Sequence, residues 1–188
     1  MDLQRIESAV REILIAIGED PDREGLIETP KRVAKMYQEV LSGVEYSNDD
    51  IARMFDKSFS EQVNNDIVVM KDIPCFSWCE HHLALMYNMR ISIGYLPVGR
   101  VIGLSKIARI ADMVCRRLQL QERIGKDILY IISKVTGTQN VAVYIEAEHS
   151  CMTARGIKKD GSRTCTFAKS GAFNDDSMKS EFFRLIGR

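Results

Sequence analysis

The first third of the chain has a helical pattern of apolar side chains. Apolar residues recur three or four positions apart, which is typical of amphipathic helices. Gly18 and Gly43 are expected to end helices, and Thr29 to cap one that has Pro30 at its first position. Four helical pieces are therefore expected: residues 2–17, a short piece that ends at Ile27, residues 30–42, and residues 48–55. None of them carries a chemical motif, so packing or oligomer contacts are their expected role.

From Phe59 onward, β-compatible runs alternate with helical ones. Five strands are expected: residues 67–73, 83–95, 101–104, 141–148 and 164–167. Three helices are expected among and after them: residues 105–118, with Ser105 as the cap, 121–135 and 180–186. This order indicates an α+β fold, with an N-terminal helical region at residues 1–56 and the α+β domain itself at residues 57–188.

Composition narrows the class of protein. A length of 188 residues suits one compact domain. Lys and Arg together number 26, as do Asp and Glu, so the net charge of zero gives no general attraction to nucleic acid or to an anionic membrane. No apolar run approaches the ~20 residues of a membrane span, and the chain begins without a secretory signal pattern. Five cysteines without the dense spacing of a disulfide scaffold indicate a reducing cytoplasm, with thiols free to bind metal.

All three histidines of the chain lie beside cysteines. Residues 79–82 read Cys-Glu-His-His, and residues 149–151 read His-Ser-Cys. In a helical turn, residues three apart point the same way, so Cys79 and His82 can reach one ion. Along a strand, His149 and Cys151 project on one face. Cys79, His82 and Cys151 would then form a Cys-Cys-His zinc set, with His81 and His149 beside the metal but not bound to it.

The number of protein ligands decides what such a zinc ion could do. Three ligands leave an open position, where a water molecule would have a pKa of about 7 and could attack at neutral pH. The alternative is a structural zinc closed by a fourth cysteine, for which Cys75, Cys115 and Cys165 are available. The two spare histidines favour catalysis, because an imidazole can give or take a proton near pH 7.

A candidate anion site lies at the start of the helix that follows Gly103. Lys106 and Arg109 are three positions apart there, and Arg155 adds a third cation just after Cys151. A helix start with three cations could hold a polyphosphate, although a solvated helix face is the alternative.

Glu122 stands at the start of the next helix, where a carboxylate is often simply favourable to the helix dipole. Its functional interpretation is a carboxylate that accepts two hydrogen bonds from a guanine edge and so selects guanine over adenine.

Four stretches together resemble the signatures of GTP cyclohydrolase I, the zinc-dependent type. They are Cys-Glu-His-His at residues 79–82, Val-Ile-Gly-Leu-Ser-Lys at 101–106, Gln-Glu-Arg at 121–123 and His-Ser-Cys-Met-Thr-Ala-Arg-Gly at 149–156. The resemblance extends from Thr-Pro-Lys-Arg-Val at 29–33 to Glu-Phe-Phe at 181–183, with departures at 83–86 and 167–171. It implies a T-fold, in which an antiparallel sheet carries a helix pair on one face, and a homodecamer of two stacked pentameric rings with active sites between subunits.

The resemblance also implies a role for each matched residue. The zinc ligands would be Cys79, His82 and Cys151, and the proton-handling residues His81 and His149. The triphosphate would be held by Ser105, Lys106, Arg109 and Arg155, and the guanine by Gln121 and Glu122. The implied reaction converts GTP and water to formate and 7,8-dihydroneopterin triphosphate, the first step of tetrahydrofolate and pterin biosynthesis. The alternatives are another T-fold enzyme that acts on pterins or deazapurines, and a non-catalytic nucleotide-binding ring with structural zinc.

Overall fold

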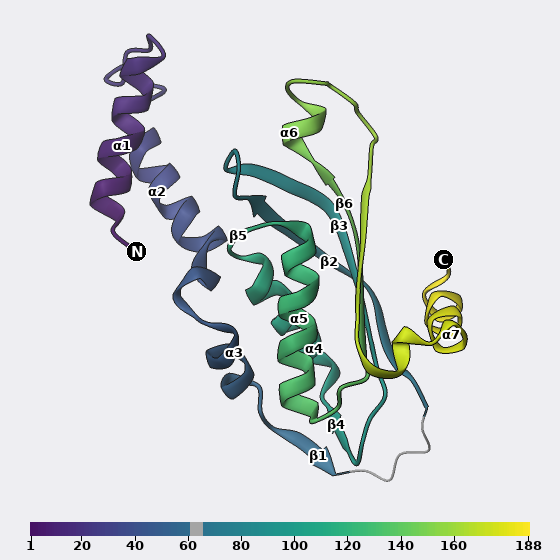
Figure 1. The fold of residues 1–188 in the computed structure, drawn as a ribbon. Helices are drawn as coiled ribbons and strands as arrows, with labels where there is room; N and C mark the ends of the chain where they lie inside the picture. Colours follow the sequence, from purple (N-terminus) through teal and green to yellow (C-terminus); the bar gives the residue numbers. More distant parts are fainter. Residues whose placement is uncertain (61–65) are drawn as a thin grey trace.

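The centre of the molecule is a five-stranded sheet, seen in a computed structural model that describes residues 1–60 and 66–188 (Figure 1). Its strands lie in the order β5-β2-β3-β6-β7. Their bounds are Val68–Cys79 (β2), Ala84–Tyr95 (β3), Leu118–Gln119 (β5), Val141–His149 (β6) and Thr164–Lys169 (β7). Neighbouring strands are antiparallel except β2 and β5, which are parallel. A separate antiparallel pair joins β1 (Ser58–Ser60) to β4 (Arg100–Ile102).

Two helices, α4 (Leu104–Cys115) and α5 (Gln121–Thr136), cover one face of the sheet (Figure 1). Alternate strand residues point at them, as a period of two requires. The resulting core contains fully buried side chains from both layers, among them Ile91, Ile93, Ile107, Ile124 and Ile128. The predicted α+β class, with a helix pair on an antiparallel sheet, is confirmed.

The other face of the sheet carries α7 (Asp176–Ile186), which follows the short 3-10 helix η2 (Gly171–Asn174). Phe173 and Phe182 are fully buried there against Ala142. Gly94 is required at this contact, because a Cβ atom on it would lie 2.8 Å from the Phe182 ring. The sheet is therefore packed on both faces, and its strands are held in a fixed register.

The N-terminal arm contains α1 (Leu3–Ala16), α2 (Thr29–Val40), the 3-10 helix η1 (Ser42–Glu45) and α3 (Asn48–Met54). α1 lies against α2 and extends away from the sheet (Figure 1). The predicted amphipathic stripe is present, yet no residue of α1 is buried. Ile13 is 58% exposed and Ile17 is 68% exposed. Part of the apolar surface of this arm is thus left exposed within one chain.

Three local predictions are wrong. The segment before α2 forms hydrogen-bonded turns instead of a short helix that ends at Ile27, because Pro21 lacks an N–H and Gly25 is a poor helix former. Thr29 is the first residue of α2 and not its cap. Ser105 is likewise inside α4, whose cap is Gly103, and neither helix has a side-chain cap bond.

α4 also ends three residues earlier than expected, at Cys115. The residues that follow pair with the end of β2 as strand β5, so that Leu118 faces Trp78 and Gln119 faces Cys79. This pairing places the start of α5 beside the Cys79 end of the sheet. None of the helices in the described ranges is both long and apolar enough to cross a bilayer.

Candidate metal centre and its surroundings

A tight turn at the end of the β2–β3 hairpin presents the first two candidate ligands. Cys79 is the last residue of β2 and pairs with Ala84 at the start of β3. Residues 80–83 form the turn, and Leu83 has a φ of +51°. The expected helical turn is therefore a hairpin turn. It nevertheless brings His82 Nδ1 to 3.8 Å from Cys79 Sγ.

The third candidate ligand comes from the end of β6. His149 closes this strand opposite Met86 of β3, and the next residues form a single helical turn, α6 (Ser150–Thr153). Cys151 therefore lies on a helical turn and not on the strand, which corrects the expectation that it shares a strand face with His149. The donor atoms of Cys79, His82 and Cys151 all lie within 4.8 Å of one another.

The electrostatics of this cluster favour a cation. Cys79 is 5% exposed and Cys151 is half-buried. Burial, together with the nearby Cys79 thiol, raises the pKa of Cys151. Two thiolates pointing at one spot repel each other, and a bound divalent cation would reverse that cost. Two thiols and one imidazole are a donor set that zinc prefers.

Cys75, Cys115 or Cys165 was considered as a fourth ligand, and all three lie outside the cluster of donor atoms. Among the described residues, the cluster of donor atoms contains only Cys79, His82 and Cys151. Cys115 is fully buried, and its thiol contacts Met89 Sδ at 3.8 Å. The Cys115 thiol also interacts with Cys75, which raises the pKa of Cys115. Cys165 lies on β7, where it accepts a hydrogen bond of 3.2 Å from the Tyr144 hydroxyl.

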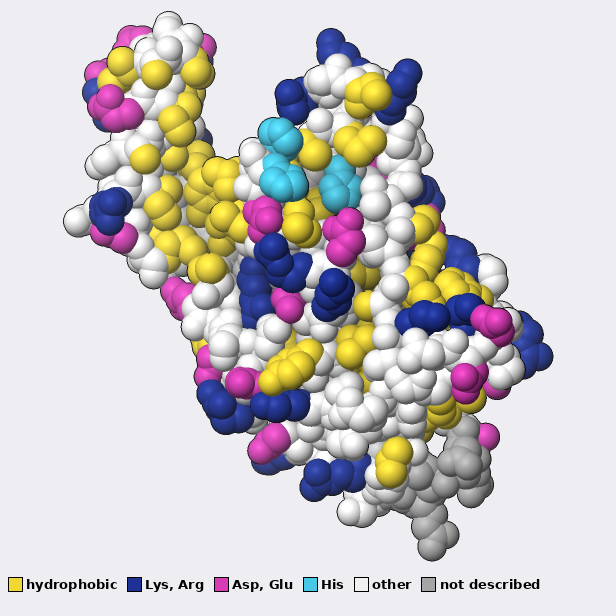
Figure 2. Space-filling model, in the orientation of Figure 1, with side chains coloured by type: hydrophobic (Ala, Val, Ile, Leu, Met, Phe, Trp, Pro, Cys, Tyr) yellow, Lys and Arg dark blue, Asp and Glu magenta, His cyan; other side chains and the backbone are white. Residues whose placement is uncertain are grey.

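Both remaining histidines lie beside the cluster. Figure 2 shows the histidine side chains gathered on one face of the molecule. The His81 ring meets the His82 ring edge-on, with centroids 6.2 Å apart, and is exposed. His149 is half-buried, and its Nε2 lies 2.8 Å from Gln121 Oε1. Burial lowers the pKa of His149, and the negative charge of Glu122 opposes part of that shift. Burial therefore favours the neutral form of the His149 imidazole.

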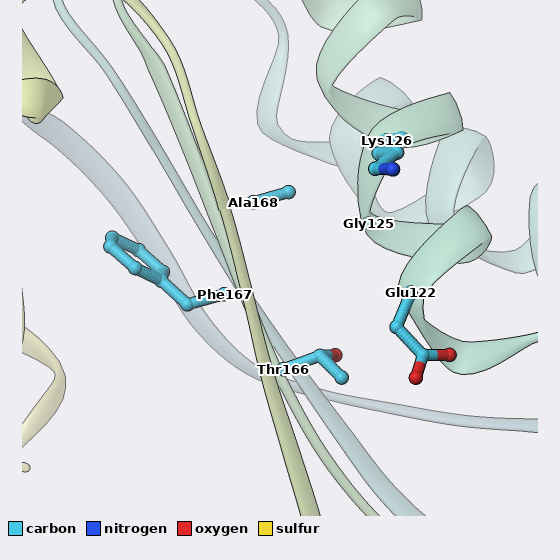
Figure 3. Close-up of a pocket in the computed structure, with 6 residues that line it drawn as sticks. All are labelled: Glu122, Gly125, Lys126, Thr166, Phe167 and Ala168. Carbon is cyan, nitrogen blue, oxygen red and sulfur yellow. The ribbon is translucent and has the colours of Figure 1, made fainter.

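Glu122 lies at the start of α5, one residue after Gln121, and its side chain is exposed. It lines a cavity of about 280 Å³ between α5 and β7 (Figure 3). The other lining residues are Gly125, Lys126, Thr166, Phe167 and Ala168. Gly125 keeps this space open, since a Cβ atom on it would lie 3.2 Å from the Ala168 Cβ. The cavity thus offers the carboxylate of Glu122, whose charge also acts on the pKa of His149.

The four candidate cationic and hydroxyl groups fall into two places. Arg155 is beside the cluster, where its Nη1 donates to His82 Nε2 at 3.2 Å. The start of α4, with Ser105, Lys106 and Arg109, lies toward the other end of the sheet. It is located there by the backbone N–H of Ile102, just before α4, which donates to the hydroxyl of Tyr95 at 3.2 Å. β3 runs 12 residues from Ala84 to Tyr95, which is roughly 35 Å at about 3.3 Å per residue. One chain does not bring these groups to the cysteines.

One ion pair beside the candidate metal centre was not predicted from the sequence. Arg123 on α5 binds Glu80 of the hairpin turn, with Nη1 2.5 Å from Oε2. The hydrogen bond from Arg123 lowers the pKa of the Glu80 carboxyl. The pair thus links the hairpin turn, which contains His81 and His82, to α5, which contains Glu122. The two partners are 43 positions apart, so no local pattern indicates their contact.

The family model and the similar sequences carry the same family name. Residues 6–187 match the family model described as GTP cyclohydrolase I. A protein of Clostridium acetobutylicum named GTP cyclohydrolase 1 is 60% identical over 190 residues, which cover 98% of this chain and 97% of that protein. A protein of the same name from Clostridium botulinum (strain Loch Maree / Type A3) is 59% identical over 191 residues, 99% of this chain and 97% of that one. A solved structure, an archaeosine synthase QueF-like protein in the apo form, aligns with a TM-score of 0.47 and 20% identity over 56% of this chain and 94% of that one.

Proposed function

Because this chain belongs to the GTP cyclohydrolase I family, we propose that Cys79, His82 and Cys151 hold the zinc ion at which GTP is opened. The chain has the α+β T-fold of that family. It converts GTP and water to formate and 7,8-dihydroneopterin triphosphate, the first step of tetrahydrofolate and pterin biosynthesis. The reaction hydrolyses C–N bonds of the five-membered ring of guanine.

The observation that carries the zinc proposal is the convergence of two thiols and one imidazole within 4.8 Å. Zinc bonds of about 2.3 Å to sulfur and about 2.0 Å to nitrogen need donor atoms roughly 3.5–4 Å apart. Small side-chain rotations would close the cluster to that size. Three protein ligands leave one position open, which is the pattern of catalytic zinc. When bound, the ion would supply the Lewis acidity that lowers the pKa of a water molecule to about 7.

Glu122 is proposed to recognise guanine. Its exposed carboxylate can accept hydrogen bonds from the N1–H and from the exocyclic amine of the base, and adenine lacks both donors at that edge. The cavity of about 280 Å³ beside it has room for part of a purine. Gln121 belongs to the same end of the site, where the N–H of the first helical residue has no partner within its own helix.

His149 and His81 are proposed as the proton carriers. Because burial favours its neutral form, His149 can take the proton that the attacking water loses and hand it to a nitrogen of the five-membered ring. That proton makes C8 a better electrophile and lets the ring open. The ribose must then open and rearrange before the new ring closes. His81 is exposed and is proposed for these later proton transfers.

Ser105, Lys106, Arg109 and Arg155 are proposed to hold the triphosphate. Arg155 already lies at the cluster. Once His82 ligates through Nδ1, its Nε2 carries the proton and no longer accepts from Arg155, which frees this guanidinium for a phosphate. The groups at the start of α4 lie toward the Tyr95 end of the sheet, whereas the cluster lies at its Cys79 end. They are therefore proposed to come from a neighbouring copy.

If neighbouring copies share each site in this way, the protein is a homo-oligomer. We propose a ring-shaped decamer of two stacked pentamers. The exposed apolar residues Ile13 and Ile17 at the end of the N-terminal arm support an assembly. In this proposal, residues 1–56 serve contacts between copies and residues 57–188 carry the catalytic groups. The reducing cytoplasm is the proposed location, because the cysteine ligands must be thiols to bind metal.

The test is direct. Purified, zinc-loaded protein is incubated with GTP, and formate and a fluorescent oxidised pterin are measured. Both products are expected in equal amounts. A deazapurine nitrile with NADPH serves as the comparison substrate and is expected to remain unchanged. Absence of formate from a protein with full zinc content would contradict the proposed function and favour a nucleotide-binding ring with structural zinc.

A further inference from the structure

The Gln121 side chain is buried and fully engaged with the protein. It is 2% exposed at the first position of α5. Its Nε2 lies 2.9 Å from the Thr164 carbonyl oxygen, 3.2 Å from the Ile145 carbonyl oxygen and 3.2 Å from Thr166 Oγ1. Backbone carbonyl oxygens can only accept hydrogen bonds, so the amide nitrogen must be the atom that faces them. This fixes the orientation of the amide group.

The fixed amide determines the protonation pattern of His149. With the nitrogen of Gln121 turned toward β6 and β7, its Oε1 faces His149 Nε2 at 2.8 Å. An amide oxygen can only accept, so Nε2 must carry a hydrogen. In a neutral imidazole, Nδ1 then holds the free electron pair. Within residues 1–60 and 66–188, no protein group makes a hydrogen bond with Nδ1.

We propose that Gln121 is a positioning residue, which holds His149 as the Nε2–H tautomer so that Nδ1 exchanges the proton with water and substrate. The inference rests on the proposed function, in which His149 carries that proton. It assigns the Gln121 side chain a task different from guanine recognition. The carboxylate of Glu122, one residue later and exposed on the cavity, is then the side chain that reads the base.

The arrangement suits this task because several elements hold the amide. Gln121 begins α5, Ile145 lies in β6, and Thr164 and Thr166 lie in β7. A rotation of the amide by 180° would place its nitrogen against the donor Nε2–H and its oxygen against two carbonyl oxygens. Both changes leave buried polar groups unpaired, which is costly. The ring of His149 is thereby kept in one orientation before substrate arrives.

The first experiment reads the tautomer without any variant. Protein labelled with 15N-histidine and loaded with zinc is studied by solid-state NMR at pH 8. The chain has three histidines, and a His149→Asn sample identifies the signal of His149 by its loss. A protonated Nε2 and an unprotonated Nδ1 are expected for His149. The opposite tautomer would overturn the proposal even if the protein releases formate from GTP.

The second experiment separates positioning from substrate binding. Gln121→Leu removes the acceptor for His149, and kcat is expected to fall about 100- to 500-fold, at the lower end of the contribution of a general acid–base group. The KM for GTP is expected to stay within about twofold, because uniform substrate binding is unchanged. Zinc content should remain that of the unaltered protein. In the same labelled sample, His149 should show a mixture of tautomers.

Glu122→Gln provides the matched comparison at the neighbouring position. This change is expected to raise KM while the His149 tautomer is retained. If Gln121→Leu instead raises KM and leaves kcat and the tautomer unchanged, its side chain is a guanine contact and the proposal is wrong. Formate release by the unaltered protein tests the proposed function separately, so the two failures are distinguishable.

Discussion

The two ends of the five-stranded sheet differ in how much of the active site one chain completes. At the Cys79 end, strand ends, a hairpin turn and a helix start bring three ligand atoms within 4.8 Å, and Gln121 and Arg155 contact the neighbouring imidazoles. At the Tyr95 end, Ser105 and Arg109 are exposed. The comparison teaches that the candidate metal centre is formed within one folded chain. The triphosphate site is proposed to be a property of the assembly.

The largest effect is expected from removing a ligand at the complete end. Cys151→Ala leaves one thiol and one imidazole, which hold zinc far more weakly than three ligands do. Zinc content by mass spectrometry and formate release are both expected to fall below detection. Cys165→Ala is the matched control, since this exposed cysteine lies on β7 and contacts Tyr144. A Cys151→Ala protein that keeps its zinc would remove this residue from the ligand set.

A second change at the same end separates chemistry from metal binding. His149→Ala is expected to retain zinc and to lose turnover by about 10²- to 10⁴-fold, the usual contribution of a general acid–base group. Zinc content and single-turnover formate release measure the two properties on one sample. A metal-free His149→Ala protein would show that His149 is needed to hold zinc. It would contradict the assignment of His149 as a proton carrier that does not bind the metal.

Mixing two inactive variants tests the incomplete end. One variant carries Lys106→Ala and Arg109→Ala, and the other carries Cys151→Ala. If each site combines these groups from two copies, random reassembly of equal amounts restores about one quarter of the sites. Formate release after dissociation and reassembly measures the rescue. Sites built within a single chain would show no rescue, because every site would then retain one of the two defects.

The smallest expected effect concerns recognition of the base. Glu122→Gln replaces a two-fold acceptor by an amide, and kcat/KM for GTP is expected to fall about 10- to 100-fold. Inosine triphosphate lacks the exocyclic amine, so its kcat/KM should fall less. The preference for GTP over inosine triphosphate is therefore expected to shrink. An unchanged preference would place guanine recognition elsewhere in the cavity or on another copy.

Much of the fold could be predicted from the sequence, because its signals are local. Apolar alternation marks β3 and β6, and the helical spacing of Ile107, Ile110 and Val114 marks α4. The turn at residues 20–27 and the caps of α2 and α4 were predicted wrongly. Local preference for a cap or a short helix is weak there, and backbone contacts decide the outcome.

The candidate site depends on contacts that no local pattern contains. The cysteine and histidine spacing indicated the candidate ligands that the fold brings together, although Cys151 lies on a helical turn that follows the end of β6. The orientation of Gln121 depends on Ile145 and Thr164, which are 24 and 43 positions away. Motif spacing could therefore suggest which residues gather, whereas the role of each side chain requires its neighbours in space.

X-ray absorption at the zinc K-edge of the zinc-loaded, substrate-free protein tests the central claim most directly. The account predicts two sulfur ligands at about 2.3 Å and two nitrogen or oxygen ligands at about 2.0 Å, one from His82 and one from water. Addition of GTP should alter the lighter ligands and leave the two sulfurs in place. Three sulfur ligands and one imidazole, unchanged by GTP, would mean a closed structural zinc and would contradict the account.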